Sequence, residues 1–290
     1  MFEGILTALV TPFRDGEVDE SALASLVERQ IAAGINGLVP CGSTGESATL
    51  SHAEHSRVIE LVVSAAAGRV PVVAGTGSNN TREAIELTRK AKEAGADGAL
   101  LLSPYYNKPT QAGIVAHYEA VADATLFPLV LYNIPGRTAS NIAPETIARL
   151  AEHPHIVGVK EACGDLDQIA HVIAACPDDF AVVSGDDALL LPMLAIGGKG
   201  GISTSSNVVP AELCELERAW RAGDSSRARE LHYRLLPIFD ILFCETNPIP
   251  VKAAVALTGA IGDEIRLPLT PISQPNRERL QAVLKEAGVL

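Results

Sequence analysis

The feature that most restricts the fold of this 290-residue chain is a short apolar run that recurs eight times. Each run is rich in Val, Ile and Leu, and most are followed by polar residues and a segment with helical periodicity. The runs are ILTALVT, GLVPCG, PVVAGTG, GALLLS, PLVLYNI, IVGVKEA, FAVVSG and GGISTS. Continuous apolar strands that alternate with amphipathic helices are typical of a parallel sheet covered on both faces. Eight such units predict an α/β protein, a closed (β/α)8 TIM barrel rather than an open sheet.

One helix-to-strand junction occurs twice in nearly the same form. The chain reads AGINGLV from Ala33 and AGADGAL from Ala94. In both copies a glycine ends a helix, Asn or Asp makes a turn, and a strand begins. The first of these helices is expected to start after Asp19, which is a suitable N-cap. The junction therefore indicates one repeated helix–strand unit.

The alternation stops after Gly223, where helix-like segments follow one another without apolar runs between them. We therefore expect a catalytic barrel over residues 1–223 and a helical C-terminal extension over residues 224–290. In the extension, Asn247 is expected to cap a helix whose first residue is Pro248.

The charge balance and the cysteines exclude several classes of function. Formal net charge is −12, with 35 acidic and 23 basic residues. No cluster of Lys and Arg stands out, which argues against nucleic acid or an anionic membrane as partner and favours a small-molecule ligand. The five cysteines are far apart and form no CxxC pair, so neither a disulfide framework nor a zinc site is expected. Without a basic leader or an apolar run of roughly 18 residues, the protein is expected to be soluble and cytoplasmic.

The stretch HIVGVKEACGD places Lys160 at the end of a run that otherwise reads as buried. Burial of an unpaired ammonium costs several kcal/mol. A lysine desolvated at a barrel mouth instead loses its proton more easily, and its neutral amine can attack a carbonyl to form a Schiff base. A buried ion pair is the alternative. Glu161 is not the expected partner, because adjacent strand residues point to opposite faces.

Other polar residues follow the predicted strands, at the barrel end where active sites lie. Around Ser43 and Thr44, the glycines of CGSTGES are expected to expose backbone N–H groups for a carboxylate; a plain turn is the alternative. Tyr106 and Tyr132 also follow strands, and core packing is the alternative for each ring. Arg137 offers a fork suited to a substrate carboxylate, with a surface salt bridge as the alternative.

The order and spacing of several motifs are similar to those of the pyruvate-dependent class I lyase/aldolase family, over essentially the whole chain. The matching motifs are ALVTPF, GSTGESATL, GTGSN, SPYYNKPTQ, LYNIPGRT, GVKEA, SGDDA, GGKGGIS and NPIPVK. The resemblance implies that a lysine Schiff base with pyruvate yields an enamine that attacks L-aspartate 4-semialdehyde. The product would be 4-hydroxy-tetrahydrodipicolinate, on the route to diaminopimelate and lysine.

The resemblance also implies a role for each matching residue. Lys160 would carry the Schiff base. Tyr132, as general acid/base, would form a proton relay with Thr44 and with Tyr106, which would reach into the site of a neighbouring subunit. Three further positions would bind substrate. These are Ser43 with Thr44 for the pyruvate carboxylate, Arg137 for the carboxylate of the aldehyde, and the Ile202 carbonyl at the pyruvate end of the pocket.

Further expectations concern cofactors and assembly. Neither metal nor nucleotide is expected, because the Schiff base with pyruvate serves as the activating group. Family members complete the site across a subunit contact, so a homotetramer built as a dimer of dimers is expected.

Two alternatives stay open at this point. The first is a Schiff-base aldolase that cleaves a 2-keto-sugar acid such as N-acetylneuraminate. Ser43 stands where the family members that use aspartate semialdehyde often have threonine, and GSTGE is also common among the sugar-acid aldolases. The Arg137 motif, PGRT, and SPYYNKP favour the aspartate-semialdehyde branch. A barrel that only binds a small carboxylate, without catalysis, is the alternative from another class.

The segment LSHAEH contains a second group of candidates. Ser51 and Glu54 form a capping-box pattern at a helix start. His52 and His55 are three apart, but no third metal ligand lies nearby in the sequence. Some family members are inhibited by L-lysine at a subunit interface, and the resemblance implies feedback inhibition by lysine here. The matching positions are Ala48, His52, His55, Asn79, Glu83 and Tyr105.

Overall fold

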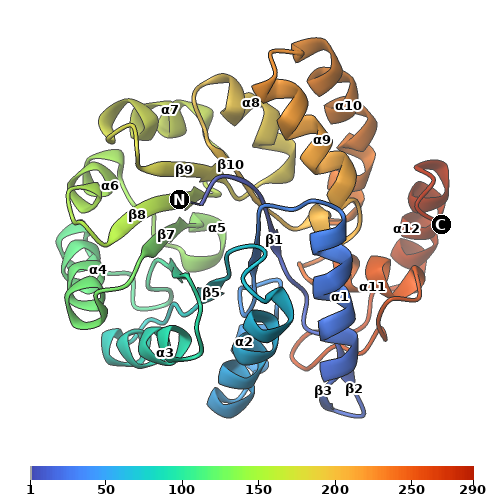
Figure 1. Cartoon of the computed structure of the whole chain (residues 1–290), viewed down its shortest axis with the longest axis horizontal. Coiled ribbons are helices and arrows are strands. Elements are labelled where there is room, and N and C mark those ends of the chain that lie inside the picture. The colour runs from blue at the N-terminus through green and yellow to red at the C-terminus, as the bar shows by residue number, and fades with distance from the viewer. Residues whose placement is uncertain (1) are drawn as a thin grey trace.

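The computed structural model describes residues 2–290 and contains an eight-stranded parallel sheet that closes on itself (Figure 1). Its strands are β1 (Gly4–Ala8), β4 (Gly37–Val39), β5 (Val73–Gly75), β6 (Gly98–Leu102), β7 (Leu129–Asn133), β8 (Ile156–Glu161), β9 (Ala181–Ser184) and β10 (Gly200–Ser203). The order is β4-β1-β10-β9-β8-β7-β6-β5, and a parallel bridge between Leu38 and Val72 joins the two ends. The predicted (β/α)8 TIM barrel is confirmed: seven of the eight strands lie inside the apolar runs, and β1 begins one residue before its run.

Helices surround these strands and continue past the last one. They are α1 (Glu20–Ala32), α2 (His52–Ala66), α3 (Thr81–Glu93), α4 (Gln111–Thr125), α5 (Pro135–Thr138), α6 (Pro144–Ala151), α7 (Leu166–Ala175), α8 (Leu190–Ala195), α9 (Pro210–Arg221), α10 (Ser225–Ile241), α11 (Ile249–Leu257) and α12 (Gln274–Glu286). Short elements complete the fold: 3-10 turns η1 (Ser47–Thr49), η2 (Asp187–Leu189) and η3 (Ser205–Asn207), and a hairpin of β2 (Phe13–Arg14) and β3 (Glu17–Val18). None of the helices within residues 2–290 combines the length and apolar character that crossing a membrane requires.

The repeated junction has the same geometry in both copies. Gly34 and Gly95 both follow a helix with a φ of +88°, a left-handed conformation that favours glycine. Two residues later, Asn36 accepts a hydrogen bond from the N–H of Ile5 at 2.8 Å, and Asp97 accepts one from Val72 at 2.8 Å. The turn residue thus fastens each new strand to the start of its neighbour.

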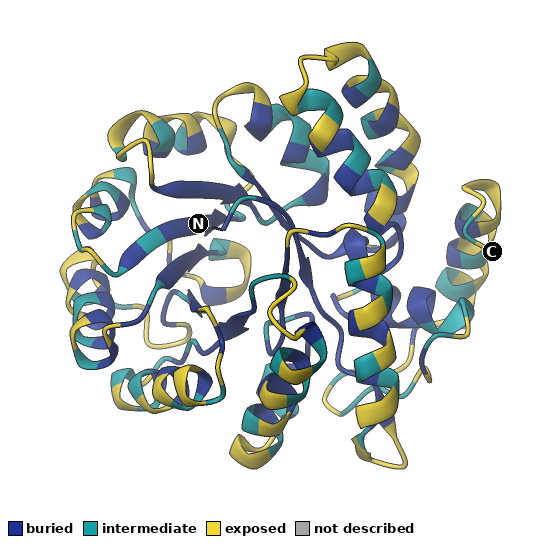
Figure 2. Cartoon of the chain, viewed as in Figure 1, coloured by how far each residue is buried: buried dark blue, intermediate teal, exposed yellow. Residues whose placement is uncertain are grey.

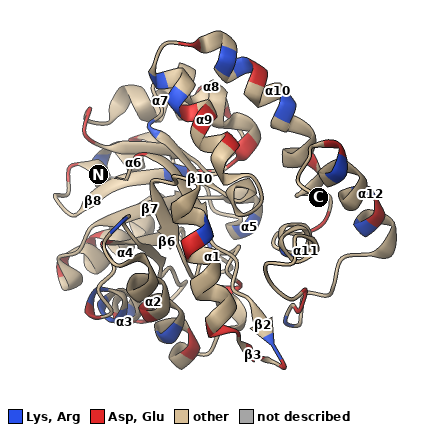
Figure 3. Ribbon diagram, turned by 45° about the vertical axis from the view of Figure 1, so that its right-hand side comes forward, with Lys and Arg blue, Asp and Glu red and all other residues tan. Residues whose placement is uncertain are grey.

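The apolar residues form two separate cores. One lies between the strands and the surrounding helices, whose outer faces are exposed (Figure 2). The other fills the inside of the barrel and includes Leu6, Val39, Val130, Tyr132 and Ile202. Lysines, arginines and acidic residues are interspersed on the outer helices (Figure 3). The strands thus face apolar atoms on both sides, as their continuous apolar sequence indicates.

Helices α10 to α12 lie together at one side of the barrel (Figure 1). The division of the chain at Gly223 stays a prediction. The expected helix cap in this region is wrong by one position: α11 begins at Ile249 with Pro248 as its N-cap. Asn247 does not cap the helix, because its side-chain amide instead donates to Thr44 Oγ1 at 3.0 Å. The segment before α11 therefore reaches the barrel mouth.

Candidate active site

Lys160 lies on β8 with its side chain buried. In the parallel register Lys160 is level with Tyr132 on β7 and with Val183 on β9. Its Nζ lies 4.4 Å from the centroid of the Tyr132 ring. The strands thus place the amine beside an aromatic ring and away from bulk water.

Burial lowers the pKa of the Lys160 ammonium to about 8; Asp187 opposes this shift and the positive charge of Arg137 adds to it. Among residues 2–290, no carboxylate lies within 4.0 Å of its Nζ to form the ion pair that was the alternative reading. With that pKa, about one Lys160 side chain in ten is neutral at pH 7. The site therefore holds an amine ready for nucleophilic attack.

Glu161, the next residue, is buried on the opposite face of β8. Its carboxylate oxygens accept hydrogen bonds from the Asn133 amide at 3.1 and 3.2 Å. Burial raises the pKa of this carboxyl to about 7, against the hydrogen bonds that favour the charged form. The expectation that Glu161 does not pair with Lys160 is confirmed, as strand alternation requires.

Tyr132 presents a phenol to the same space. Burial raises its pKa to about 12, while the charge of Arg137 works in the other direction. The phenol therefore keeps its proton at neutral pH and can donate a hydrogen bond.

The loop after β4 carries Ser43 and Thr44. The N–H groups of these two residues make no hydrogen bond to protein atoms within residues 2–290. Thr44 Oγ1 accepts from the Asn247 amide at 3.0 Å and lies 3.4 Å from Thr204 Oγ1. The loop thus offers free backbone donors and a positioned hydroxyl, an arrangement suited to a carboxylate.

Arg137 lies in α5, directly after β7. One guanidinium nitrogen donates to the main-chain carbonyl of Asn247 at 2.8 Å. Within the described chain this side chain has no acidic partner, so the surface salt bridge that was its alternative reading is absent. Its remaining donors are available to a bidentate carboxylate.

Five of the predicted residues line one cavity of about 50 Å³, namely Ser43, Thr44, Tyr132, Arg137 and Lys160. Ile202 is buried on β10 inside the barrel but does not line this cavity. Tyr106 does not line it either; this residue is 89% exposed and its φ is +70°. The chain by itself therefore brings together predicted residues from the ends of three strands, β4, β7 and β8, but not Tyr106.

The cavity wall also includes residues that were missed as candidates, among them Gly185, Thr204 and Asn247. Gly185 and Thr204 follow β9 and β10, in the polar segments that mark strand ends. A Cβ atom on Gly185 would lie 2.8 Å from Lys160 Cε, so glycine is required for close approach. For Asn247 the motif NPIPVK was the one signal, and it indicated a helix start rather than a wall of the site.

A larger cavity of about 530 Å³ adjoins the first and shares Ser43, Tyr132, Arg137 and Asn247 with it. Its wall also includes five of the six positions matched to a lysine pocket, namely Ala48, His52, His55, Glu83 and Tyr105. The sixth, Asn79, donates to the main-chain carbonyl of Tyr105 at 3.3 Å. The structure thus brings all six positions to one region.

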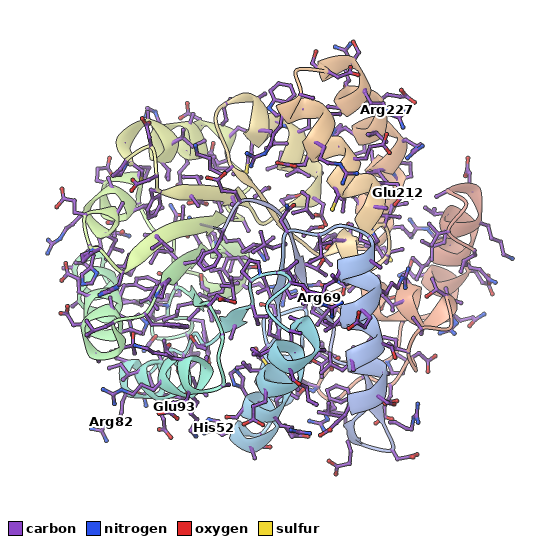
Figure 4. All side chains as sticks on the ribbon, in the orientation of Figure 1. His52, Arg69, Arg82, Glu93, Glu212 and Arg227 are labelled. Atoms are coloured by element: carbon purple, nitrogen blue, oxygen red, sulfur yellow. The ribbon has the colours of Figure 1, made fainter. Side chains whose placement is uncertain are left out.

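His52 and His55 have protein partners in this region. His52 is the first residue of α2 (Figure 4) and lies 3.0 Å from a Glu83 oxygen. His55 lies 2.8 Å from the Gly75 carbonyl, and the predicted capping box of Ser51 and Glu54 is present. Within residues 2–290, no group of three or more His, Cys, Asp or Glu side chains is arranged to hold a metal ion.

Comparison with known proteins gives a consistent result. A sequence profile of the dihydrodipicolinate synthetase family matches residues 1–287. The 4-hydroxy-tetrahydrodipicolinate synthase of Nitratidesulfovibrio vulgaris strain DP4 is 58% identical over 290 residues, covering 100% of this chain and 99% of the relative.

Two solved structures are also similar over nearly their whole length. The chloride-inhibited dihydrodipicolinate synthase of Acinetobacter baumannii, complexed with pyruvate, has a TM-score of 0.98 and 46% identity, covering 100% of both chains. The enzyme of Cyanidioschyzon merolae with lysine bound has a TM-score of 0.97 and 44% identity, covering 100% of this chain and 99% of the other.

Proposed function

The chain belongs to the dihydrodipicolinate synthetase family, and from that premise we propose that it condenses pyruvate with L-aspartate 4-semialdehyde to give 4-hydroxy-tetrahydrodipicolinate. It is an enzyme of the lyase class, and its place is in the biosynthesis of diaminopimelate and lysine. The observation that carries the proposal is the buried, unpaired amine of Lys160 at a cavity lined by a tyrosine, a threonine and an arginine.

The reaction begins at Lys160. Its neutral amine adds to the C2 carbonyl of pyruvate, and a proton moves from nitrogen to oxygen. The resulting hydroxyl takes a second proton from Tyr132 and leaves as water, so a protonated Schiff base remains. Loss of a proton from C3 gives an enamine, whose C3 attacks the aldehyde carbon while the aldehyde oxygen takes up a proton. The amino group of the second substrate then displaces Lys160 and closes the ring. The Schiff base itself activates the carbon acid, so no cofactor is needed for these steps.

Tyr132 and Thr44 carry protons during these steps. The phenol of Tyr132 keeps its proton at neutral pH and can deliver it to the leaving hydroxyl of the carbinolamine. Tyr106 of a neighbouring subunit completes the relay, which accounts for its exposure in the single chain. The free N–H groups of Ser43 and Thr44 bind the pyruvate carboxylate, and the Ile202 carbonyl lies toward the pyruvate end.

Arg137 binds the carboxylate of L-aspartate 4-semialdehyde. Arg137 lines both cavities, and its guanidinium has no acidic partner in the described chain. A bidentate pair with a carboxylate orients the aldehyde toward the enamine.

Borohydride reduction tests this function. Incubation with pyruvate and borohydride is expected to add one reduced pyruvate to the native protein and none to Lys160→Ala. Lys285→Ala, which removes an exposed lysine on α12, is the matched control and should be labelled like the native protein. An absent adduct, or one that survives Lys160→Ala, would leave only a carboxylate-binding barrel. Activity with sugar-acid aldehydes instead of aspartate semialdehyde would support the sugar-acid aldolase.

L-lysine is proposed to inhibit the enzyme by binding in the larger cavity. Glu83 and the main-chain groups around Tyr105 offer acceptors for its ammonium groups, and the cavity adjoins Tyr132 and Arg137. The similar enzyme of Cyanidioschyzon merolae has been solved with lysine bound. Activity assays in millimolar lysine test this, and full activity there would contradict it.

The enzyme is proposed to be a cytoplasmic homotetramer, built as a dimer of dimers. Its support is the incomplete relay of the single chain, since Tyr106 lies outside the cavity. Light scattering coupled to gel filtration measures the mass, and an active monomer would contradict the assembly.

A further inference from the structure

Asn247 connects the two halves of the site from outside the barrel strands. Its side-chain amide donates to Thr44 Oγ1 at 3.0 Å, and its main-chain carbonyl accepts from Arg137 at 2.8 Å. Asn247 is 203 residues from Thr44 and 110 from Arg137 along the chain. One residue therefore touches both the relay hydroxyl and the guanidinium proposed to bind the aldehyde substrate.

The amide contact fixes the direction in which Thr44 can pass a proton. A hydroxyl has one proton and two lone pairs, and an amide nitrogen can only donate. Thr44 Oγ1 therefore accepts from Asn247, and its own proton remains for another acceptor. That acceptor is Thr204, 3.4 Å away, or a group in the cavity that both threonines line. Asn247 thus keeps the Thr44 hydroxyl as a donor toward the reacting atoms.

The carbonyl contact holds Arg137 without neutralising it. A carboxylate in this position would pair with the guanidinium and compete with a substrate carboxylate. Asn247 engages the guanidinium through a neutral dipole, and its side-chain Oδ1 is buried with no hydrogen-bond partner within residues 2–290. A neutral amide is therefore suited to this position, because a carboxylate here would compete with the substrate for Arg137.

We propose that Asn247 is a positioning residue for both substrates: its amide orients the Thr44 hydroxyl as a proton donor, and its main-chain carbonyl holds Arg137 free for the aldehyde's carboxylate. This inference rests on the proposed condensation of pyruvate with aspartate semialdehyde. Under this proposal, the selection of substrates at the open end of the barrel depends on Asn247, which precedes α11, as well as on residues of the barrel strands.

Two variants remove the side-chain contact to Thr44, with and without an added charge, and both keep the main-chain carbonyl that accepts from Arg137. Asn247→Asp has nearly the same shape but cannot donate from its oxygens once ionised, and it places a negative charge beside Arg137. Asn247→Ala removes the donor without adding a charge. The matched control is Asn276→Ala, which removes an amide on α12 that donates to Glu245 and accepts from Arg279, outside both cavities.

The experiment measures kcat, both KM values and the borohydride-trapped pyruvate adduct for each full-length variant. Both Asn247 variants are expected to lower kcat about 10- to 100-fold, the scale of a misplaced catalytic group. Only Asn247→Asp should also raise the KM for aspartate semialdehyde, by about tenfold or more. The amount of pyruvate adduct should stay at the native level, and Asn276→Ala should match the native enzyme throughout.

Three results would overturn the inference. A native kcat in Asn247→Asp would mean that the donor is not needed. An equal loss of kcat and of pyruvate adduct in both variants would mean that Asn247 only stabilises the fold. A native protein that forms no adduct with pyruvate would overturn the proposed function, and this inference with it.

Discussion

Two lysines are buried in this protein, and they differ in whether a carboxylate lies within reach of the ammonium. Lys160 is 5% exposed and Lys252 is 1% exposed, and each ammonium lies over an aromatic ring, at 4.4 and 4.0 Å. Lys252 Nζ lies 2.5 Å from a carboxylate oxygen of Glu46, whereas Lys160 has no such partner within the described chain. Burial lowers the pKa of both lysines; the charge of Asp187 opposes the shift at Lys160, whereas Glu46 opposes it at Lys252 by its charge and by a hydrogen bond. The carboxylate partner therefore makes Lys252 one half of an ion pair, whereas Lys160, which has no such partner, is available as a nucleophile.

The Lys252 pair belongs to a network that supports the site. Glu46 also accepts from the N–H of Arg266 at 3.2 Å, and Arg266 pairs with Glu54 at the start of α2. Glu46 has a φ of +56°, a conformation that is costly for a residue with a side chain. The network thus holds the end of the loop that carries Thr44, while the adjacent Lys160 is left free for chemistry.

The largest expected effect is the loss of activity in Lys160→Met. Removal of the nucleophile should lower kcat by about 10³-fold or more. The same substitution replaces an unpaired buried amine with an apolar chain of similar length, so the free energy of unfolding should stay the same or rise. Steady-state assays and urea denaturation measure the two quantities. A clear loss of stability would indicate that Lys160 has a structural partner.

Lys252→Met should do the reverse and mainly reduce stability. It leaves Glu46 buried without its ammonium partner, at an expected cost of about 3–5 kcal/mol in the free energy of unfolding. Urea denaturation checks this value. Replacing both residues, as Lys252→Met with Glu46→Gln, should recover much of the loss, because no unpaired charge remains. A Lys252→Met protein as stable as the native one would contradict the comparison.

Gly185→Ala tests the close packing around Lys160. The new Cβ would lie 2.8 Å from Lys160 Cε and 2.8 Å from Ala162 Cβ, so the lysine must move. Because the amine is displaced, activity should fall about 10- to 100-fold. Overpacking should also lower the free energy of unfolding by about 1–3 kcal/mol. Gly136→Ala is the control, because no atom lies within 4 Å of the added Cβ. Equal activities of the two variants would show that the space beside Lys160 is not limiting.

The smallest expected effect is the pH dependence of Schiff base formation. With a pKa of about 8, the neutral fraction of Lys160 rises about fivefold between pH 7 and pH 8 and levels off above that. The rate of pyruvate trapping should follow this curve. A rate that keeps rising tenfold per unit up to pH 10 would mean that the amine keeps its ordinary pKa.

The same pKa predicts a stability difference. The folded pKa of Lys160 is lower than its unfolded pKa near 10.4, so the unfolded chain binds more protons between about pH 8 and pH 10. The free energy of unfolding should therefore rise with pH in that window. The free energy of unfolding should rise less steeply with pH in Lys160→Met, which lacks this amine. Urea denaturation of both proteins across this pH range measures the difference.

The sequence alone predicted the strands of this barrel, because each one is a continuous apolar run and local periodicity is visible without a structure. It also predicted Ser43, Thr44, Tyr132, Arg137 and Lys160 as neighbours, since parallel strands end at one rim. The resemblance of the motifs added the roles of these residues, which stay proposals. The helix start near Asn247 was wrong by one residue, because a proline and a polar residue in series fit either position.

Tertiary structure alone decided which buried groups acquire partners. Glu46 and Lys252 are 206 residues apart, and Asn247 and Thr44 are 203 apart. No local pattern encodes such pairs, because they form only when the barrel closes and the C-terminal helices pack against it. The sequence determined that a lysine would be buried at the end of a strand. Packing decided that Lys160 would have no carboxylate within reach and would therefore lose its proton easily, whereas Lys252 would be paired with Glu46.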